Sequence, residues 1–207
     1  MGIDWTVFHL VNGAIATRDW LEDPVTALAD AVVPLYALAT VGLWLLARPY
    51  GNPRWKLASS SALIAAAVAL AENQVIAHLW DRPRPFTEHP GLTHVLAART
   101  TDPSFPSDHA AAAFAIAFAV LAFSRRAGIA FLVGAALIAL SRIALGMHYP
   151  SDVLAGALVG FGAATLVTTL GRTWVVRLVV LGSRVTDPLL RPVWAWCRRL
   201  LPAPRRL

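Results

Sequence analysis

Long apolar stretches, separated by short charged segments, limit the possible folds of this sequence more than any other feature. Five of them lie at roughly 25–47, 57–79, 109–124, 127–146 and 152–171, and they approach or exceed the roughly 20 residues that an α-helix needs to cross a bilayer. Hydrophobic residues make up 57% of the chain and charged residues 14%, whereas a soluble domain carries about 25% charged residues. The sequence therefore predicts an all-α integral membrane protein with a bundle of five to six transmembrane helices.

The two ends of the chain are less clearly membrane-spanning. Residues 4–17 are amphipathic, which is typical of a helix that lies in the membrane interface. The apolar stretch 173–185 is interrupted by Arg177 and Arg184 and predicts either a short sixth span or an interfacial helix. We therefore divide the chain into three parts: an N-terminal interfacial segment, 1–24; a transmembrane domain, 25–171; and a basic cytoplasmic tail, 172–207.

Basic residues in the short connecting segments predict the orientation of the protein, because loops rich in Lys and Arg stay in the cytoplasm. They lie in segment 48–56, in the turn at 125–126 and throughout the tail, whose arginines are Arg172, Arg177, Arg184, Arg191, Arg198, Arg199, Arg205 and Arg206. If the spans alternate in direction, all these segments lie on the same side. Segments 80–108 and 147–151 then face the outside of the cell membrane.

The net charge of +6 does not require a nucleic-acid partner. A basic tail beside membrane spans is explained more simply by contact with anionic lipid headgroups. We therefore expect membrane lipids, and no nucleic acid, as partners. The sequence holds a single cysteine, Cys197, which excludes a disulfide within the chain and a metal site built from several cysteines.

The polar residues of segment 141–152 fit a nucleophile and its supporting groups. His148 and Asp152 are four residues apart, and a helix beginning near Pro150 would let the carboxylate accept a hydrogen bond from one imidazole nitrogen. The other nitrogen would then act as a nucleophile or a base. Arg142 lies near the end of the preceding span, where a guanidinium is costly unless it has a role such as binding phosphate oxygens. Taken singly, His148 fits a turn residue, and Arg142 a side chain reaching to the interface, equally well.

Segment 104–109, Ser-Phe-Pro-Ser-Asp-His, leads into the third predicted span. Ser107 and Asp108 are candidate N-cap residues of that helix, whose first backbone N–H groups can bind phosphate oxygens. His109 lies in the first turn, where it can protonate a leaving oxygen. Taken alone, this segment is explained better by a plain N-cap followed by an interfacial histidine.

Segment 81–86, Asp-Arg-Pro-Arg-Pro-Phe, follows the second predicted span. Its prolines restrict the backbone and present Arg82 and Arg84 at the membrane surface. Alone, these arginines are explained better by contact with lipid headgroups. Together, the three segments place two histidines, an aspartate and at least two arginines on one membrane face. A phosphoryl transition state needs such cations, a nucleophile in line with the leaving group, and an acid.

In these three segments the sequence resembles the type-2 phosphatidic acid phosphatase, or lipid phosphate phosphatase, superfamily. That family carries the motifs Lys-x6-Arg-Pro, Pro-Ser-Gly-His and Ser-Arg-x5-His-x3-Asp, in this order. The third motif is complete over 141–152, and the second is present at 106–109 with Asp108 in place of glycine. The first motif keeps its Arg-Pro but has Ala77 at the lysine position. The resemblance covers about residues 55 to 170.

The resemblance implies a role for each motif residue. His148 would attack phosphorus and form a phosphohistidine, with Asp152 orienting it, and His109 would protonate the leaving oxygen and then activate water. The phosphate would be held by Arg84, Arg142, Ser107 and the backbone at Asp108. Neither a metal nor another cofactor is implied. Because the lysine is missing, the resemblance leaves room for further contacts, and the candidates are Arg82, Glu72 and Asn73. The last two fit hydrogen bonds between helices equally well.

The Ser-Phe-Pro-Ser-Asp-His and Arg-Pro-Arg-Pro-Phe segments are most similar to the bacitracin-resistance type of undecaprenyl-diphosphate phosphatase. This subgroup implies a transmembrane phosphatase domain over 25–171 that hydrolyses undecaprenyl diphosphate to undecaprenyl phosphate and phosphate, outside the cell membrane. An isoprenoid or glycerolipid phosphate is the expected partner. Two alternatives stay open. One is the same reaction on phosphatidic acid or phosphatidylglycerol phosphate, and the other is a membrane protein that binds a lipid phosphate without turning it over.

Overall fold

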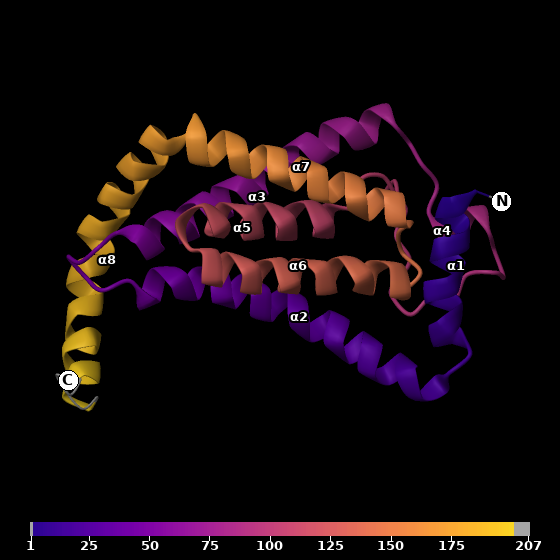
Figure 1. Ribbon diagram of the computed structural model, residues 1–207, viewed down its shortest axis with the longest axis horizontal. Coiled ribbons are helices and arrows are strands. Elements are labelled where there is room, and N and C mark those ends of the chain that lie inside the picture. The colour runs from indigo at the N-terminus through magenta and orange to yellow at the C-terminus, as the bar shows by residue number, and fades with distance from the viewer. Residues whose placement is uncertain (1, 201–207) are drawn as a thin grey trace.

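The computed structural model describes residues 2–200, with the side chains of residues 2–196 (Figure 1). These residues form eight helices and no strand, which confirms the predicted all-α class. The helices are α1 (Ile3–Ala16), α2 (Asp19–Leu46), α3 (Arg54–Leu79), α4 (Pro85–Glu88), α5 (Asp108–Phe123), α6 (Arg125–Ala144), α7 (Pro150–Thr169) and α8 (Arg172–Leu200). The side chains that lie outside the described part of the chain include those of Cys197, Arg198, Arg199, Arg205 and Arg206.

Helices α2, α3, α5, α6 and α7 run alongside one another and form a bundle (Figure 1). The central helix is α5, which packs against α3, α6 and α7. Most of its buried residues are alanines, and α7 meets it with two glycines. A Cβ atom at Gly160 would lie 2.5 Å from the Ala111 carbonyl oxygen, and one at Gly156 would lie 2.6 Å from that of Ser107. Small residues four apart allow this close approach of two membrane helices.

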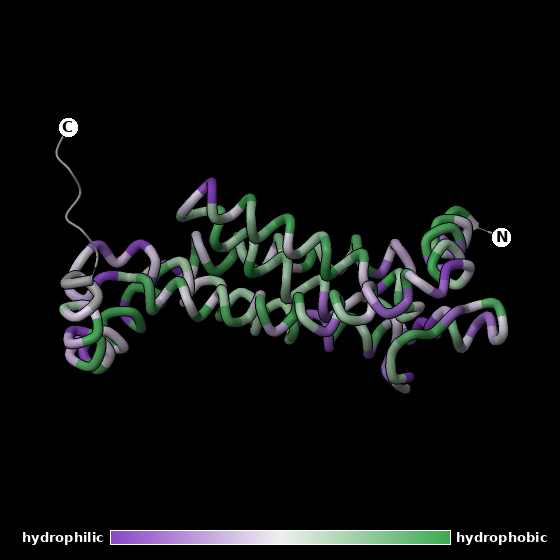
Figure 2. The backbone as a smooth tube through the Cα atoms, turned by 90° about the horizontal axis from the view of Figure 1, so that it is seen from below, coloured by the Kyte–Doolittle hydropathy of each residue, from purple (hydrophilic) through white to green (hydrophobic). Residues whose placement is uncertain are grey.

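The bundle has the apolar outer surface of a membrane protein. Within the described chain, helices α2, α3, α6 and α7 are long and apolar enough to cross a membrane, whereas α5 is shorter, with 16 residues. The middle of the bundle is hydrophobic (Figure 2), and large side chains such as Leu38, Val133 and Leu158 are exposed on its outside. So large an exposed apolar surface is unusual in water but is solvated by lipid tails. The protein is therefore an integral membrane protein, as predicted.

The bundle helices follow the five predicted spans to within a few residues, with one exception. Helix α2 begins at Asp19 rather than at residue 25, and it continues through Pro24 and Pro34. Membrane helices tolerate proline because neighbouring groups satisfy the backbone carbonyls that proline leaves without a donor. The limit predicted for the N-terminal interfacial segment therefore falls inside a helix.

The two ends of the bundle are covered differently. Helices α1 and α4 lie at one end, and α8 runs across the other (Figure 1). An ion pair between Lys56 and Asp187, whose exposed fractions are 3% and 4%, fixes α8 to the bundle. A second link is the 3.3 Å hydrogen bond from Trp194 Nε1 to the Leu45 carbonyl oxygen. This crosswise direction favours the interfacial alternative for residues 173–185 over a sixth span.

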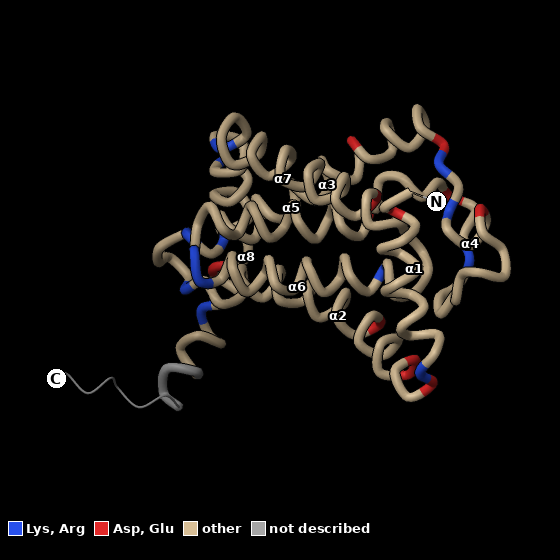
Figure 3. The backbone as a smooth tube through the Cα atoms, turned by 45° about the vertical axis from the view of Figure 1, so that its right-hand side comes forward, with Lys and Arg blue, Asp and Glu red and all other residues tan. Residues whose placement is uncertain are grey.

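Charged side chains are distributed unequally between these ends. Lys and Arg gather at the α8 end, whereas Asp and Glu are concentrated around α1, α4 and the start of α2 (Figure 3). This is the asymmetry from which the positive-inside rule predicts a cytoplasmic α8 end. All three sequence motifs lie toward the opposite, acidic end.

Candidate active site

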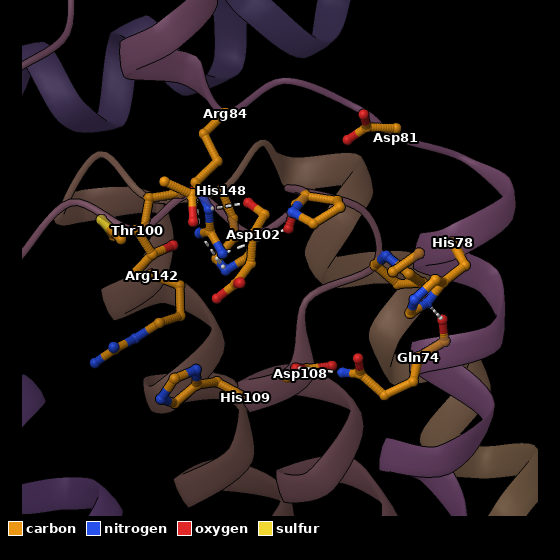
Figure 4. A pocket seen from close by; sticks show the side chains of 15 residues that line it. Gln74, His78, Asp81, Arg84, Thr100, Asp102, Asp108, His109, Arg142 and His148 are labelled. Carbon is orange, nitrogen blue, oxygen red and sulfur yellow. Dashed lines mark hydrogen bonds between the residues drawn. The ribbon is translucent and has the colours of Figure 1, made fainter.

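A cavity of about 760 Å³ opens near the α1 and α4 end of the bundle, and all three motifs contribute to its wall. The side chains of Arg84, His109, Arg142 and His148 lie on one side of it, together with Asp102 (Figure 4). The wall continues past Asp108 to the end of α3, where Gln74, Ala77 and His78 line it. The motifs that are separate in sequence therefore meet at one place.

The turn between α6 and α7 fixes His148 in the wall. Gly146 has a positive φ of 79°, a conformation that favours glycine, and an added Cβ atom there would overlap the carbonyl oxygen of His94. Pro150 is the first residue of α7, a position that suits its fixed φ angle. Between these two restraints the residue His148 is 4% exposed.

Hydrogen bonds determine which nitrogen of His148 carries the proton. Nδ1 lies 2.8 Å from the Ser104 carbonyl oxygen, which only accepts, so Nδ1 is the donor. Nε2 lies 3.2 Å from Nη1 of Arg84, which only donates, so Nε2 carries the lone pair. Burial, followed by the charge of Arg84, lowers the pKa of His148 to about 3. At neutral pH the imidazole is therefore uncharged, with a lone pair at the cavity.

The carboxylate of Asp152 acts on His148 less directly than the spacing predicted. Its Oδ2 atom lies 3.9 Å from His148 Nδ1, which is too long for a hydrogen bond. Oδ2 instead accepts hydrogen bonds from Ser104 Oγ, at 2.6 Å, and from the Tyr149 backbone nitrogen, at 2.8 Å. The predicted direct hydrogen bond is therefore wrong. Asp152 holds Ser104, and the Ser104 carbonyl oxygen orients the imidazole.

Two arginines place positive charge in the wall of the cavity, whose lining also includes Asp81, Asp102 and Asp108. Arg84 is clamped by backbone carbonyl oxygens: Nε is 2.9 Å from that of Asp102, and Nη1 is 3.0 Å from that of Met147. Burial lowers the pKa of the Arg84 guanidinium, although nearby carboxylates oppose the shift. Arg142 lines the same cavity and makes a 3.4 Å hydrogen bond from Nε to Ser141 Oγ. Its Nη atoms have no hydrogen-bond partner within the described side chains, so they are free to bind an anion.

The first turn of α5 forms the floor of the cavity. His109 is exposed there and lines the wall. Ser107 is fully buried, and its Oγ atom lacks a hydrogen-bond partner within the described part of the chain. Its backbone nitrogen donates to the Asp152 carbonyl oxygen at 3.0 Å, which fixes the start of α5 against α7. The first N–H groups of a helix have no acceptor within the helix, so those of this first turn are available to bind an anion.

Asp108, which replaces the glycine of the family motif, is held by side chains of α3. Its Oδ1 atom accepts a 2.8 Å hydrogen bond from Asn73 Nδ2, and Oδ2 lies 3.4 Å from Gln74 Nε2. Asn73 therefore makes a hydrogen bond between helices, which was the alternative to a phosphate contact in the sequence analysis. Glu72 lies on the same helix, but it is not part of the cavity wall.

Arg82 lies outside the cavity, in contrast to its predicted place as an additional phosphate contact. Its guanidinium hydrogen-bonds to Asp4, Ser151 and Asp152, and it lies 4.1 Å from the ring centre of Tyr149. The sequence reasoning also did not select Ser104, Gln74 or Asp4. For Ser104 a signal existed, because it belongs to the same motif segment as His109.

Comparison with known proteins finds relatives by sequence and by structure. The sequence profile of the PAP2 superfamily matches residues 56–175. Undecaprenyl-diphosphatase BcrC of Bacillus subtilis is 32% identical over 157 residues, which cover 76% of this chain and 78% of that protein. Decaprenylphosphoryl-5-phosphoribose phosphatase of Mycobacterium tuberculosis is 35% identical over 130 residues, which cover 62% and 68%. The crystal structure of Aquifex aeolicus LpxE has the same fold, with a TM-score of 0.63 and 22% identity over 80% of this chain and 94% of that one.

Proposed function

The chain belongs to the PAP2 superfamily and is a lipid phosphatase, and we propose that it hydrolyses undecaprenyl diphosphate to undecaprenyl phosphate and inorganic phosphate. The names of two relatives support this substrate class. The Bacillus relative is named for undecaprenyl diphosphate, and the mycobacterial relative is named for a decaprenyl lipid phosphate. Both names denote a long isoprenoid chain joined to phosphate.

The observation that carries the proposal is the environment of His148 Nε2. This atom carries the lone pair, faces the cavity and lies within 3.2 Å of Arg84, while Arg142 lines the same wall. A neutral nucleophile beside two guanidinium groups suits a reaction in which negative charge is spread over the phosphoryl oxygens. A protein that only bound phosphate would need the arginines but would gain nothing from a fixed tautomer of a neutral histidine.

In the first step, the lone pair of His148 Nε2 attacks the terminal phosphorus, and the bond from that phosphorus to the bridging oxygen breaks. Protonated His109 gives its proton to that oxygen, so undecaprenyl phosphate leaves and a phosphohistidine is formed. Meanwhile Arg84, Arg142, Ser107 and the backbone N–H groups at Asp108 hold the phosphoryl oxygens. No metal ion is needed for this step, because these groups supply the positive charge.

In the second step, neutral His109 takes a proton from water, and the resulting oxygen attacks the phosphorus. The bond between phosphorus and His148 breaks, so inorganic phosphate is released and both histidines return to their starting states. This reversal of the role of one acid–base group is expected when a covalent intermediate is formed and then hydrolysed.

We further propose that the cavity faces the outside of the cell membrane and that α8 lies on the cytoplasmic surface. The distribution of Lys and Arg supports this orientation, because they gather at the α8 end (Figure 3). The isoprenoid tail would then stay in the bilayer while its diphosphate reaches the cavity from the outer interface.

The experiment that tests this function is phosphate release from undecaprenyl diphosphate in detergent, with excess chelator, by the native chain and by His148→Ala. We expect release that survives the chelator and disappears in the variant. Activity on phosphatidic acid or phosphatidylglycerol phosphate, but not on undecaprenyl diphosphate, would keep the reaction and replace the substrate. Lack of turnover of every lipid phosphate, with normal lipid binding, would support the non-catalytic binding protein instead.

A further inference from the structure

Helix α1 contributes a carboxylate to the groups behind the cavity. Asp4 Oδ1 accepts a 2.9 Å hydrogen bond from the Ser151 backbone nitrogen, and Oδ2 accepts one of 2.6 Å from Ser151 Oγ. Oδ2 also lies 2.7 Å from Nη2 of Arg82. Asp4 precedes the region that matches the family profile by about 50 residues, so the family motifs do not include it.

Arg82 connects this carboxylate to the one in α7. Its Nη1 atom lies 2.7 Å from Asp152 Oδ1 and 2.6 Å from Ser151 Oγ, and its Nη2 atom lies 2.7 Å from Asp4. The guanidinium therefore bridges two carboxylates, one on each of its two terminal nitrogens. Asp152 is fully buried, and a buried carboxylate needs such a counter-charge to stay in place. The Tyr149 ring lies against the guanidinium and restricts it further.

Asp4 is ionised when it makes these contacts at neutral pH. Burial opposes ionisation, but hydrogen bonds from Ser151 and Arg82 outweigh it and hold the pKa of Asp4 below its ordinary value. Hydrogen bonds to the charged form of a carboxylate have this effect.

The same arginine holds Ser104 through both its side chain and its backbone. The Arg82 carbonyl oxygen accepts a 2.8 Å hydrogen bond from the Ser104 backbone nitrogen. The Arg82 side chain holds Asp152, whose other oxygen accepts from Ser104 Oγ at 2.6 Å. The Ser104 peptide is therefore fixed on two sides, and its carbonyl oxygen is the acceptor for His148 Nδ1.

We propose that Asp4 and Arg82 are positioning residues, which hold Asp152 and the Ser104 peptide and thereby keep the lone pair of His148 on Nε2. The inference rests on the proposed role of His148 as the nucleophile. If the Ser104 carbonyl oxygen moves, Nδ1 loses its hydrogen-bond acceptor, and the tautomer with the proton on Nδ1 is no longer stabilised. A proton on Nε2 would remove the nucleophile and would also face the donor groups of Arg84.

The test compares Asp4→Asn and Arg82→Lys with the native chain, with purified full-length protein in detergent and undecaprenyl diphosphate as substrate. Asparagine keeps the size of the side chain but removes its charge. Lysine keeps the charge but cannot bridge two carboxylates as a planar guanidinium does. The matched controls are Asp19→Asn, at the start of α2, and Arg126→Lys, at the other end of the bundle, both of which change exposed side chains.

We expect kcat to fall on the order of 10- to 100-fold in both variants, because small displacements of reacting groups have effects of this size. KM and the inhibition constant of inorganic phosphate should stay within about threefold, since Arg84 and Arg142 are unchanged. Asp4→Glu, which restores the charge, should recover part of the loss. The two control variants should behave like the native chain.

Three outcomes would overturn the inference. One is an unchanged kcat in Asp4→Asn and Arg82→Lys. Another is a weakening of phosphate inhibition in parallel with kcat, which would mean that the whole site is disordered and that the residues are merely structural. The third is failure of all three variants to fold, which would have the same meaning. His148→Ala in the same experiment separates the proposed mechanism from the proposed role of Asp4 and Arg82. If His148→Ala stays active, the proposed mechanism is wrong, irrespective of the result for the Asp4 and Arg82 variants.

Discussion

The buried, neutral state of His148 predicts how the stability of the protein depends on pH. Burial lowers the pKa of this imidazole to about 3, whereas a histidine in an unfolded chain has a pKa of about 6.5. Below pH 6.5 the unfolded chain therefore binds a proton at His148 that the folded chain excludes. The folded state loses stability as the pH falls from 6.5 toward 3, and it loses no more from this group at lower pH.

The size of the effect follows from the difference between the two pKa values. Each pKa unit is worth about 1.4 kcal/mol, so a difference of about 3.5 units is worth about 5 kcal/mol in full. At pH 4.5, two units below the pKa of the unfolded chain, about 3 kcal/mol of this has already been lost. That is a large part of the stability of a typical protein.

The assay is a series of unfolding titrations in mixed detergent micelles at pH 7.5, 5.5 and 4.5, with the native chain and His148→Gln. Glutamine can still donate a hydrogen bond to the Ser104 carbonyl oxygen, but it does not titrate. Other acidic and basic groups are the same in both proteins and cancel in the difference between their unfolding free energies. That difference should shift by about 3 kcal/mol in favour of the variant between pH 7.5 and 4.5.

The control is His78→Gln, which removes an exposed histidine at the end of α3. It should follow the native curve, because it leaves the buried His148 unchanged. Curves for His148→Gln and the native chain that stay parallel down to pH 4.5 would refute the reasoning. They would mean that the folded chain binds the proton at His148 as readily as the unfolded chain does, so that burial does not lower the pKa of this imidazole.

Other changes have separable effects. His109→Gln should slow release of undecaprenyl phosphate on the order of 100- to 1,000-fold, because it removes the acid. With an aryl phosphate, whose leaving group needs no proton, the first step should lose much less, so the variant should show a burst of phenol followed by slow hydrolysis of the phosphohistidine. Gly160→Leu should destabilise the bundle by about 1–3 kcal/mol, because its Cβ atom meets the backbone of α5, whereas Gly162→Leu, which faces open space, should not change the unfolding free energy. Asp187→Asn leaves Lys56 buried without a counter-charge and should lower the unfolding free energy by about 3–5 kcal/mol.

The features of the protein that sequence reasoning predicted are those set by local composition. The spans can be predicted from the sequence because a bilayer requires long apolar stretches, and this requirement does not depend on which helices pack together. The start of α2 was missed because Asp19, Glu22, Asp23 and Pro24 interrupt the apolar pattern there, although the helix continues through them. The meeting of His148, His109 and Arg84 was predicted because alternating spans return the three motif segments to one end of the bundle.

The connections behind His148 could not be predicted, because they depend on which helix packs against which. Asp4 and Ser151 are 147 residues apart, and neither lies in an apolar pattern that would show their contact. Arg82 and Arg84 look equivalent in the sequence, yet they point to different groups. The backbone at Arg84 has φ −74° and ψ 156°, close to polyproline II. With three residues per turn in such a segment, side chains two positions apart point in different directions.

The two departures from the family motifs lie next to each other in the structure. Asp108 stands in place of glycine, and its carboxylate is held by Asn73 and Gln74 of α3. Ala77, at the lysine position, lies one turn beyond Asn73 on the same helix, and both Ala77 and Asp108 line the cavity. A lysine at position 77 would therefore meet a carboxylate in addition to the phosphate. Alanine at position 77 and aspartate at position 108 are therefore compatible, because no lysine is present to pair with the carboxylate.

This proximity predicts that a lysine at position 77 alone strengthens phosphate binding only slightly. In Ala77→Lys the new ammonium group should pair with Asp108, so the inhibition constant of inorganic phosphate should change less than about threefold. In the double variant Ala77→Lys with Asp108→Gly, the ammonium group is free for the phosphate, and a charge-assisted hydrogen bond should tighten inhibition by about tenfold or more. Asp108→Gly alone is the control. If the single lysine variant binds phosphate as tightly as the double variant does, Asp108 does not act on position 77, and the two departures are independent.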